Sequence, residues 1–586
     1  MPTLRLALAQ LDLVVGDLEG NVAAVVASLR SAEDAGCDLC LFPELAVTGY
    51  PPEDLLLKPR FLADNHRGIE EIAAATGRCA AVVGFVERGA DRPGDERWDG
   101  GGTRPPARLA NAAAVCAGGS IVGVYRKRIL PNYGVFDEKR WFDPGSGHHV
   151  LYEVAGAAVG VSICEDVWYA DGPVVELGVG GADLVVNINA SPFAHGRFEE
   201  RLTMLRRRVG QAGCPVAYCN LVGGQDELVF DGASVVVGAD GSLLGAARQF
   251  EEELLLVDLE LEVRSARTLA VVPVTGPAAD RRPLPAPSVG PPLSPHAEIY
   301  EALVLGTRDY LVKNGFGDVV IGLSGGIDSS LVATIAVDAI GPERVHALAM
   351  PSRYSSEGSV ADAKELADRL GIGLSVVPIE PAHRALTGLL APVLQGEPAG
   401  LTDENLQSRV RGLLLMAVSN SIGRSIVLTT GNKSEIATGY FTLYGDAVGG
   451  FAAIKDIAKT EVYELCRYRN ARPGPGPLDP IPASVLEKPP SAELRPDQRD
   501  DQSLPAYEVL DPVLEAYVEG DRTGPEMVAD GVDPAVVDAV VRLVDGAEYK
   551  RRQLAPGVRI TAKAFGKDRR VPITNRYRAT DAPDPR

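Results

Sequence analysis

The stretch Val319–Leu331 reads VVIGLSGGIDSSL and predicts a buried strand that turns directly into a helix. Its two glycines let backbone N–H groups approach an anion, at a helix N-terminus whose dipole favours negative charge. A Walker loop would end in Lys followed by Ser or Thr, and no Lys lies near this stretch. Asp328 would repel phosphates unless Mg²⁺ bridged them. The stretch therefore predicts a phosphate site with a metal; an ordinary glycine-rich turn is the alternative.

The sequence after residue 295 alternates between buried strands and helices. This order predicts an α/β domain with a doubly wound parallel sheet, because parallel strands need a long crossover that is usually a helix. Ligands of such domains bind at the carboxyl ends of the strands, where the glycine-rich stretch lies. The expected strands are Val319–Leu323, Val345–Met350, Ser375–Ile379 and Ser425–Thr430, and the expected helices are Ser330–Ile340, Ser359–Leu370 and Leu406–Ile422.

A proline-rich segment precedes this half of the chain. The stretch from about Val272 to Pro295 reads VPVTGPAADRRPLPAPSVGPPLSP, and its prolines cannot sustain a helix or a central strand. We therefore predict a domain over residues 1–262, a linker over 263–297 and a second domain over 298–586. The expected strands of the first domain are Arg5–Gln10, Asp38–Pro43, Ala80–Val86, Ala112–Cys116, Ile121–Tyr125, Ala158–Cys164 and Leu184–Asn189.

Size and composition narrow the class of protein. A chain of 586 residues exceeds a single core, and 46% apolar with 23% charged residues is typical of a globular protein. The net charge of -21 argues against non-specific nucleic-acid binding. The N-terminus turns polar too soon for a signal peptide, and no apolar run is long enough to span a bilayer. Most of the eight Cys lie in apolar runs, so we expect a cytoplasmic protein without disulfides.

Three strand ends in the first domain carry residues that could split an amide. Glu44 follows one expected strand, Lys127 ends another, and Cys164 ends a third, where the two acids Glu165 and Asp166 come next. A thiolate could attack, the Glu could accept and return the proton, and the ammonium could stabilise the oxyanion while favouring the thiolate. Taken singly, each has a simpler interpretation: a buried thiol, a helix cap and a solvated strand end.

These residues occur in an order that resembles the nitrilase, or carbon–nitrogen hydrolase, superfamily. The matching motifs are FPEL-x-x-TGY, a Lys before LPNY, and ICED-x-W, between about Leu4 and Leu259. The resemblance implies an αββα sandwich with Glu44, Lys127 and Cys164 as the catalytic triad, and Glu138 as a residue that could orient Lys127. In glutamine-hydrolysing members, residues at the positions of Tyr133, Ser191 and Arg197 hold the glutamine, although many relatives carry Lys where Arg197 stands.

The second half resembles another family. The SGGxDS order is similar to the phosphate loop of ATP pyrophosphatases. The segments MPSRYSS, ENLQSRVRG, TTGNKSEIATGYFTLYGD, KPPSAELRPDQRDDQSLP and EYKRR resemble NAD synthetases from about Pro295 to Arg578. The whole chain is similar to the glutamine-dependent form of that family. The charged segment Glu487–Ser503 then corresponds to a lid that folds over the nucleotides.

This resemblance implies three sets of binding residues. The ATP set comprises Gly322, Leu323, Ser324, Gly325, Gly326, Ile327, Asp328, Ser329, Ser330, Met350, Thr430 and Lys459. The deamido-NAD set comprises Asn405, Arg409, Glu435 and Lys550. The expected Mg²⁺ carboxylates are Asp328 and Glu435. In the helix Leu406–Ile422 we expect an apolar stripe that is buried, formed by Leu413, Leu414, Met416 and Ala417, with Arg409 and Asn405 on another face.

The resemblance also implies a reaction, the last step of NAD biosynthesis. Ammonia from glutamine would pass between the domains and amidate deamido-NAD, after ATP has adenylated its carboxylate and released pyrophosphate. Homo-oligomerisation is expected from the family alone. Two alternatives are another glutamine-dependent ATP pyrophosphatase, such as GMP or asparagine synthetase, and a hydrolase whose second half only senses nucleotide. GMP and asparagine synthetases use a different glutaminase domain, which argues against the first alternative. The presence of Asp328, Glu435 and Lys459 argues against a second half that only senses nucleotide.

Overall fold

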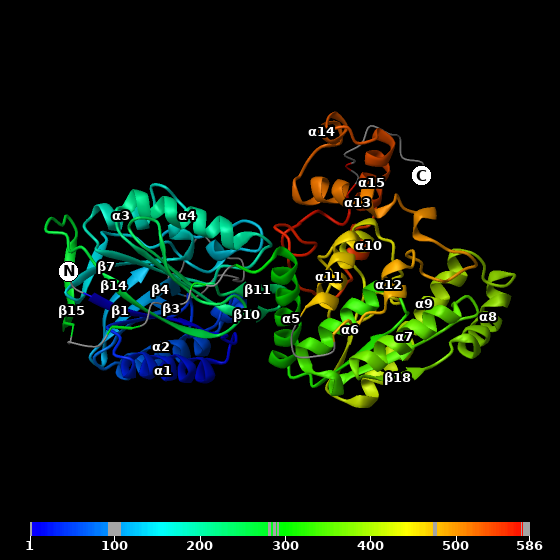
Figure 1. The fold of residues 1–586 in the computed structure, drawn as a ribbon, viewed down its shortest axis with the longest axis horizontal. Helices are drawn as coiled ribbons and strands as arrows, with labels where there is room; N and C mark the ends of the chain where they lie inside the picture. The colour runs from blue at the N-terminus through cyan, green and yellow to red at the C-terminus, as the bar shows by residue number, and fades with distance from the viewer. Residues whose placement is uncertain are drawn as a thin grey trace. The chain divides into compact units, whose positions relative to one another are not determined.

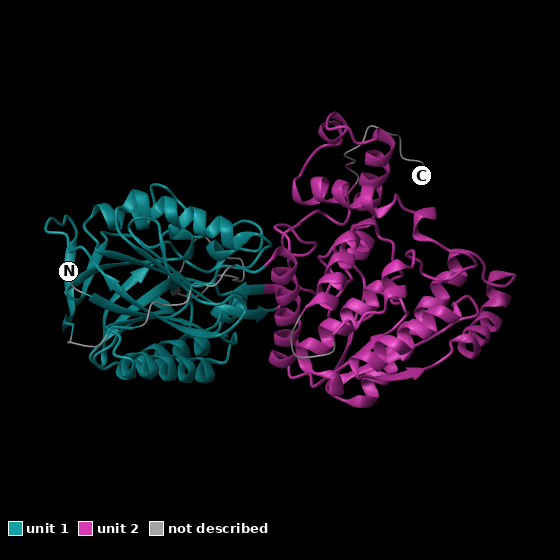
Figure 2. Ribbon diagram, in the orientation of Figure 1, with its two compact units in different colours: residues 1–225, 229–293 teal, residues 226–228, 294–586 magenta. Residues whose placement is uncertain are grey.

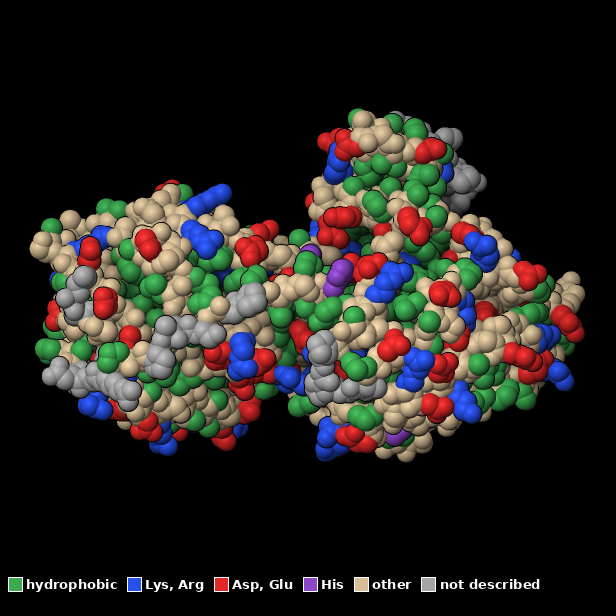
Figure 3. All heavy atoms as spheres, in the orientation of Figure 1, with side chains coloured by type: hydrophobic (Ala, Val, Ile, Leu, Met, Phe, Trp, Pro, Cys, Tyr) green, Lys and Arg blue, Asp and Glu red, His purple; other side chains and the backbone are tan. Residues whose placement is uncertain are grey.

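The computed structural model describes residues 3–91, 107–278, 283–284, 289, 292–472, 478–575 and 577. They form two compact units, shown in Figure 2: unit 1 comprises residues 1–225 and 229–293, and unit 2 comprises residues 226–228 and 294–586. Among the described residues, no helix is both long and apolar enough to cross a membrane. On the face in Figure 3, acidic and basic side chains are interspersed, and the described residues gather into no basic patch there.

Unit 1 contains two stacked sheets between two pairs of helices. The first sheet has the order β14 (Glu253–Glu260), β1 (Thr3–Gln10), β2 (Leu39–Leu41), β3 (Ala80–Asp91), β4 (Ala107–Ala117) and β5 (Ser120–Arg126). The second has the order β13 (Leu243–Ala246), β12 (Val235–Val237), β9 (Val216–Asn220), β8 (Leu184–Asn189), β7 (Ala157–Ile163), β6 (Val150–Ala155) and β15 (Ala270–Pro277). A small hairpin joins β10 (Val222–Gln225) and β11 (Leu228–Asp231).

The packing of these layers confirms the predicted αββα sandwich. Apolar side chains from both sheets share one core cluster, including Leu6, Leu41, Val161 and Ile188. Figure 1 shows α1 (Leu18–Asp34) and α2 (Pro59–Ala74) on one side of the strands, and α3 (Pro173–Val179) and α4 (Arg197–Ala212) on the other. Because both faces of the central strands are covered, these strands are apolar throughout rather than alternating. The seven predicted strands are confirmed, with ends that differ by a few residues.

Unit 2 is built on a parallel sheet in the order β18 (Gly373–Val376), β17 (Val345–Ala349), β16 (Asp318–Gly322) and β19 (Ser425–Leu428). The chain runs outward from β16 in one direction and then returns to add β19 on its other side, which confirms the doubly wound sheet. The helices are α5 (Pro295–Lys313), α6 (Ile327–Ile340), α7 (Glu357–Leu370), α8 (Glu380–Leu394), α9 (Leu401–Ile422), α10 (Lys433–Thr438), α11 (Lys459–Ala471), α12 (Ala483–Glu487), α13 (Tyr507–Leu514), α14 (Gly524–Ala529), α15 (Pro534–Gly546) and α16 (Glu548–Arg551).

Two features of the chain differ from the sequence expectation. The strand β15 lies inside the range predicted as a linker, where it pairs with β6. It tolerates proline because it is the edge strand of its sheet. The helix α8 was not predicted, and α9 begins five residues earlier than expected.

The predicted apolar stripe of α9 is wrong. Leu413 is 67% exposed and Met416 39% exposed, whereas Ser408, Gly412 and Leu415 are buried. A Cβ atom at Gly412 would lie 2.8 Å from the carbonyl oxygen of Tyr444. The helix therefore approaches the loop beside it so closely that only glycine fits at position 412, while Val410 and Leu415 are the large apolar residues that face inward.

A buried ion pair stabilises unit 1. Arg201 of α4 donates from both terminal nitrogens to Asp231 at 3.0 and 3.1 Å, and both side chains are 1% exposed. The guanidinium lies over the ring of Tyr218, 5.3 Å from its centroid. Burying either charge without its partner is strongly unfavourable.

We expect Asp231→Ala to destabilise unit 1 by about 3–5 kcal/mol, because it leaves the Arg201 charge buried and unpaired. Thermal unfolding would measure this as a lower midpoint for unit 1. Arg206→Ala, on the exposed side of the same helix, is the matched control and should change stability by at most about 0.5 kcal/mol. A midpoint for Asp231→Ala equal to that of the control would contradict the prediction.

Candidate active sites

A buried ammonium lies at the centre of the first site. Lys127 follows β5, where its backbone N–H donates to the carbonyl of Asn111 in β4 at 2.8 Å. Its Nζ lies 2.7 Å from Oε1 of Glu44 and 2.8 Å from Oε1 of Glu138, and its side chain is fully buried. Burial alone would lower the pKa of Lys127, but Glu138 and Glu44 together raise it above its ordinary value. The two carboxylates therefore favour the charged form of this buried ammonium.

Three donors fix the orientation of the Glu44 carboxylate. Oε1 accepts from Nζ of Lys127 and, at 2.6 Å, from Nδ2 of Asn111, while Oε2 accepts from the backbone N–H of Ala190 at 3.0 Å. The loop that carries Glu44 lies directly on β3 at Gly84. A Cβ atom there would come within 2.3 Å of the Leu45 nitrogen, so only glycine fits.

Cys164 is the first residue after β7. Its φ of 42° lies in the left-handed region, which is uncommon for a non-glycine residue and marks a strained turn at a functional position. Burial raises the pKa of its thiol well above the ordinary value, Glu44 raises it further, and Lys127 only partly opposes both. Lys127 thus favours the thiolate, as expected, while burial and Glu44 act against it.

The residues expected to hold glutamine are linked to the neighbours of Cys164 and Glu44. The hydroxyl of Tyr133 donates to Oε1 of Glu165 at 3.0 Å. Ser191 is buried beside Ala190, and its backbone N–H donates to Oδ1 of Asn220 at 2.9 Å. Arg197 starts α4, where its guanidinium lies 5.5 Å from the centroid of the Trp168 ring and pairs with Glu200 at 3.0 Å. Its charge also acts on Glu165, which follows Cys164.

Sequence reasoning missed two residues of this site. Asn111 lies in an alanine-rich strand. It could have been noticed as a polar residue within an apolar run. Tyr50, in the TGY motif, donates from its hydroxyl to Oε1 of Glu138 at 3.0 Å. Glu138 thereby accepts from both Tyr50 and Lys127, consistent with the orienting role expected for it. Burial raises the pKa of Glu138, and Lys127 opposes this shift.

The second site is a cavity of about 430 Å³ in unit 2. It opens where β16 ends between β17 and β19, the switch point of the sheet. Gly325 has a φ of 76°, and a Cβ atom there would lie 2.1 Å from the carbonyl oxygen of Ser359. The loop can therefore hold its backbone close to a ligand only with glycine at this position. The hydroxyls of Ser329 and Ser330 donate to the Gly326 carbonyl at 3.0 and 2.8 Å, which fixes the first turn of α6.

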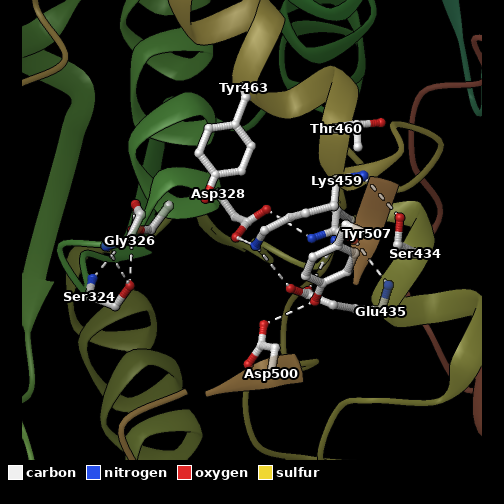
Figure 4. A network of polar contacts seen from close by, with 12 residues as sticks. Ser324, Gly326, Asp328, Ser434, Glu435, Lys459, Thr460, Tyr463, Asp500 and Tyr507 are labelled. Atoms are coloured by element: carbon white, nitrogen blue, oxygen red, sulfur yellow. Dashed lines mark hydrogen bonds and ion pairs between the residues drawn. The ribbon is translucent and has the colours of Figure 1, made fainter. Parts of the chain in front are cut away.

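Two carboxylates face one ammonium in this cavity, as Figure 4 shows. Nζ of Lys459 contacts Oδ2 of Asp328 and lies 3.4 Å from Oε1 of Glu435. Asn432 donates to Oδ1 of Asp328 at 2.8 Å and accepts the backbone N–H of Glu435 at 3.0 Å, so it sets the spacing of the two carboxylates. Burial raises the pKa of Glu435, with Lys459 opposing and Asp328 adding to this shift.

A divalent cation fits this donor set. Within the part of the chain that the structure describes, no group of three or more His, Cys, Asp and Glu residues could hold a metal alone. Mg²⁺, however, takes one or two carboxylates and completes its shell with phosphate and water oxygens, which Asp328 and Glu435 beside the phosphate loop allow. Asp500 of the predicted lid adds a buried Oδ1 atom without a partner and accepts the Tyr507 hydroxyl through Oδ2 at 2.9 Å.

Most of the remaining predicted residues line the same cavity, and two do not. Those that line it are Gly322, Leu323, Ser324, Gly325, Gly326, Ile327, Asp328, Ser329, Met350, Asn405, Thr430, Glu435, Lys459 and Lys550. Ser330 is buried and is not among the residues that line the cavity. Arg409 is exposed, and its Nε donates to the Leu443 carbonyl at 3.2 Å. Arg411 lines the cavity instead and was missed; its Nε donates to the carbonyl of Met350 at 3.0 Å. Residues 488–494, Gln498 and Asp500 also line it.

Comparisons with known proteins identify the family. The family model for carbon-nitrogen hydrolase matches residues 5–268, and the model for NAD synthase matches residues 299–554. The glutamine-dependent NAD(+) synthetase of Thermotoga maritima is 44% identical over 595 residues, which cover 99% of this chain and 100% of that protein. The chain belongs to the glutamine-dependent NAD(+) synthetase family.

Further relatives agree with this assignment along the whole chain. The glutamine-dependent NAD(+) synthetase of Xylella fastidiosa strain 9a5c is 45% identical over 578 residues, which cover 98% of this chain and 99% of that protein. The solved structure of glutamine-dependent NAD+ synthetase from Acinetobacter baumannii in complex with ADP is 40% identical. It covers 99% of this chain and 100% of its own, with a TM-score of 0.73.

We expect Asn111→Asp to slow amide cleavage at the first site by about 100-fold, which corresponds to about 2.7 kcal/mol. The new carboxylate would lie beside Oε1 of Glu44 and make that residue a poorer base at neutral pH, because two adjacent carboxyl groups share a proton. Ammonia release from an amide substrate measures the effect. Asn65→Asp is the matched control, because Asn65 is equally buried but, among the described residues, its side chain pairs with the backbone of Val86 rather than with a carboxylate. Equal rates in both variants would contradict the role of Asn111.

Proposed function

We propose that this protein makes NAD from deamido-NAD, using ammonia released from glutamine and ATP cleaved to AMP and pyrophosphate. The observation that carries the proposal is the presence, in one chain, of a buried Glu44–Lys127–Cys164 cluster and of a phosphate-loop cavity that contains Asp328, Glu435 and Lys459. Full-length similarity to the glutamine-dependent NAD(+) synthetase of Thermotoga maritima supports it.

Glutamine cleavage begins when Glu44 removes the proton of the Cys164 thiol. Sγ then attacks the side-chain amide carbon, and the carbonyl oxygen becomes an oxyanion stabilised by Lys127 and by the backbone N–H of Glu165. Glu44 returns the proton to the nitrogen, the C–N bond breaks, and ammonia leaves a glutamyl thioester on Cys164. Water, deprotonated by Glu44, hydrolyses the thioester to glutamate and restores the thiol. Tyr133, Ser191 and Arg197 would hold the substrate, with Arg197 pairing with its α-carboxylate.

Amidation begins when the nicotinate carboxylate of deamido-NAD attacks the α-phosphorus of ATP. The bond to the β-phosphate oxygen breaks, and pyrophosphate leaves. Asp328 and Glu435 would hold Mg²⁺, which when bound offsets charge on the phosphates. Lys459 and the backbone of Gly325 and Gly326 supply further positive charge to the same oxygens. The ATP residues proposed above, together with Asn405, Arg409 and Lys550 for deamido-NAD, position the two substrates.

Ammonia then attacks the carbonyl carbon of the adenylate. A free carboxylate is a poor acyl electrophile, whereas its mixed anhydride with AMP is a good one, and AMP is the leaving group. Ammonia in water at neutral pH is mostly ammonium, which is not nucleophilic. We therefore propose that ammonia passes from the first site to the second through a path closed to solvent.

The remaining expectations concern the setting of the enzyme. We propose small-molecule substrates only, a cytoplasmic location and assembly into a homo-oligomer. The net charge of -21 supports the exclusion of nucleic acid, because non-specific binding requires a basic surface.

We expect Cys164→Ala to lose glutamine-driven NAD synthesis by a factor of about 10³ or more, while synthesis from added ammonia stays within about twofold. The reason is that the variant lacks the nucleophile of the first site and keeps the second site intact. Formation of NAD and AMP from deamido-NAD and ATP, with glutamine or ammonium chloride as the nitrogen source, measures both activities. Retained glutamine-driven synthesis would show that Cys164 is not the nucleophile.

We expect Glu435→Gln to reduce both glutamine-driven and ammonia-driven synthesis by about 100-fold or more, because it removes one of two proposed metal carboxylates. Pyrophosphate release measures the loss. Glu464→Gln is the matched control, since Glu464 lies on the exposed surface of α11 and pairs only with Arg467. If glutamine hydrolysis occurred in the unsubstituted protein without AMP formation, the second unit would be a nucleotide sensor instead.

A further inference from the structure

A second acid beside the thiol, Asp166, has no part in the reaction described above. It is fully buried two residues after Cys164, and its carboxylate accepts four hydrogen bonds. Burial raises the pKa of Asp166 to about 6, and the hydrogen bonds oppose this shift. A buried carboxylate is costly to retain, and here all its partners are donors. The role of Asp166 can therefore be inferred from the four groups that donate to it.

Three of the four donors belong to the segment that carries Lys127. The hydroxyl of Tyr125, two residues before Lys127, donates to Oδ2 of Asp166 at 2.8 Å. The backbone N–H groups of Arg128 and Ile129, which follow Lys127 directly, donate to Oδ1 at 3.2 and 3.0 Å. Asp166 thus binds the chain on both sides of Lys127. The ring of Tyr125 is itself held by stacking on His149, with centroids 6.0 Å apart.

The fourth donor belongs to the turn that carries the thiol. The backbone N–H of Ile163 donates to Oδ2 of Asp166 at 3.1 Å. Ile163 is the last residue of β7, and Cys164 follows it with a φ of 42°. Such a conformation persists only where surrounding contacts enforce it. The hydrogen bond to Ile163 closes this turn over the strained residue.

We propose that Asp166 is a positioning residue that ties the Lys127 segment to the Cys164 turn and thereby sets the position of the ammonium relative to the thiol. The proposal rests on the proposed function of the first site. An oxyanion formed by attack of Sγ must lie within hydrogen-bonding distance of Nζ of Lys127. The residues that carry these two atoms directly follow strands of different sheets, β5 and β7. Asp166 is one side chain with hydrogen bonds to the ends of both.

An amide cannot replace this carboxylate. The backbone N–H groups of Ile163, Arg128 and Ile129 can only donate, and they approach both oxygens of Asp166. In Asp166→Asn, either orientation of the side chain turns an NH₂ group toward at least one of these N–H groups. Either the Lys127 segment or the Cys164 turn must therefore lose a hydrogen bond to residue 166.

We expect Asp166→Asn to lower kcat for glutamine hydrolysis by about 100-fold, because misplacement of a catalytic group by about 1 Å has effects of this size. KM should stay within about threefold, since Tyr133, Ser191 and Arg197 are untouched. Ammonia-driven NAD synthesis should be unchanged and reports that the full chain is folded. Tyr125→Phe, which releases only the strand β5, should lower kcat by roughly tenfold.

The matched control is Asp183→Asn. Asp183 is also a buried carboxylate with donor partners only, the backbone N–H groups of Ala158 and Arg264 and the side chain of Arg267, but it lies at the opposite end of β7 and β8. A structural role alone would lower the melting temperature of Asp166→Asn and Asp183→Asn alike and leave kcat in both near that of the unsubstituted protein.

The proposal is overturned if Asp166→Asn retains kcat within about threefold of the unsubstituted protein, or if its KM and kcat change together. If Asp166→Asn loses ammonia-driven synthesis as well, Tyr125→Phe decides: an unchanged kcat overturns the proposal, and a selective loss supports it. Failure of the proposed function is a separate result, because the unsubstituted protein would then release no ammonia from glutamine.

Discussion

The first site depends on one buried interaction, the contact of the Lys127 ammonium with the carboxylates of Glu44 and Glu138. An isolated ammonium could not be buried at this depth, and neither could the two carboxylates. Each charge therefore stabilises the others, and Asn111 and the Ala190 N–H also donate to Glu44 while Tyr50 donates to Glu138. Oε2 of Glu138 is buried without a hydrogen-bond partner among the described residues. The site thus holds two carboxylates and one ammonium near the buried thiol of Cys164.

The second site also places one ammonium between two carboxylates, but its surroundings differ. Lys459 lies between Asp328 and Glu435, but these groups line an open cavity beside the phosphate loop rather than a closed core. A ligand can therefore reach these charged groups. Under the proposed function, Mg²⁺ and phosphates would contact them, whereas in the first site only the uncharged side-chain amide of glutamine would meet the buried charges. The closed core suits proton transfer, and the open cavity suits phosphate chemistry.

The functional residues of both sites lie just after the ends of strands. Glu44, Lys127 and Cys164 follow β2, β5 and β7, and the phosphate loop follows β16. Buried strands read as apolar runs, so the position of each polar residue after such a run could be predicted from the sequence. Contacts between strands of different sheets could not, because periodicity gives the face of a residue but not its neighbour across the core. The hydrogen bonds of Asp166 to Tyr125, Arg128 and Ile129 are contacts of this second kind.

The sequence by itself predicted the parallel sheet of unit 2 and seven strands of unit 1, because buried strands appear as apolar runs, and its resemblance to two families predicted the two chemistries and the residues proposed to carry them. It misjudged α9, where Leu413 is exposed and Gly412 is buried, and it did not anticipate Arg411, which lines the cavity. Only the tertiary structure decided these points. The close approach of α9 to its neighbouring loop leaves room only for small residues at Ser408 and Gly412, and this approach depends on chain segments distant in sequence.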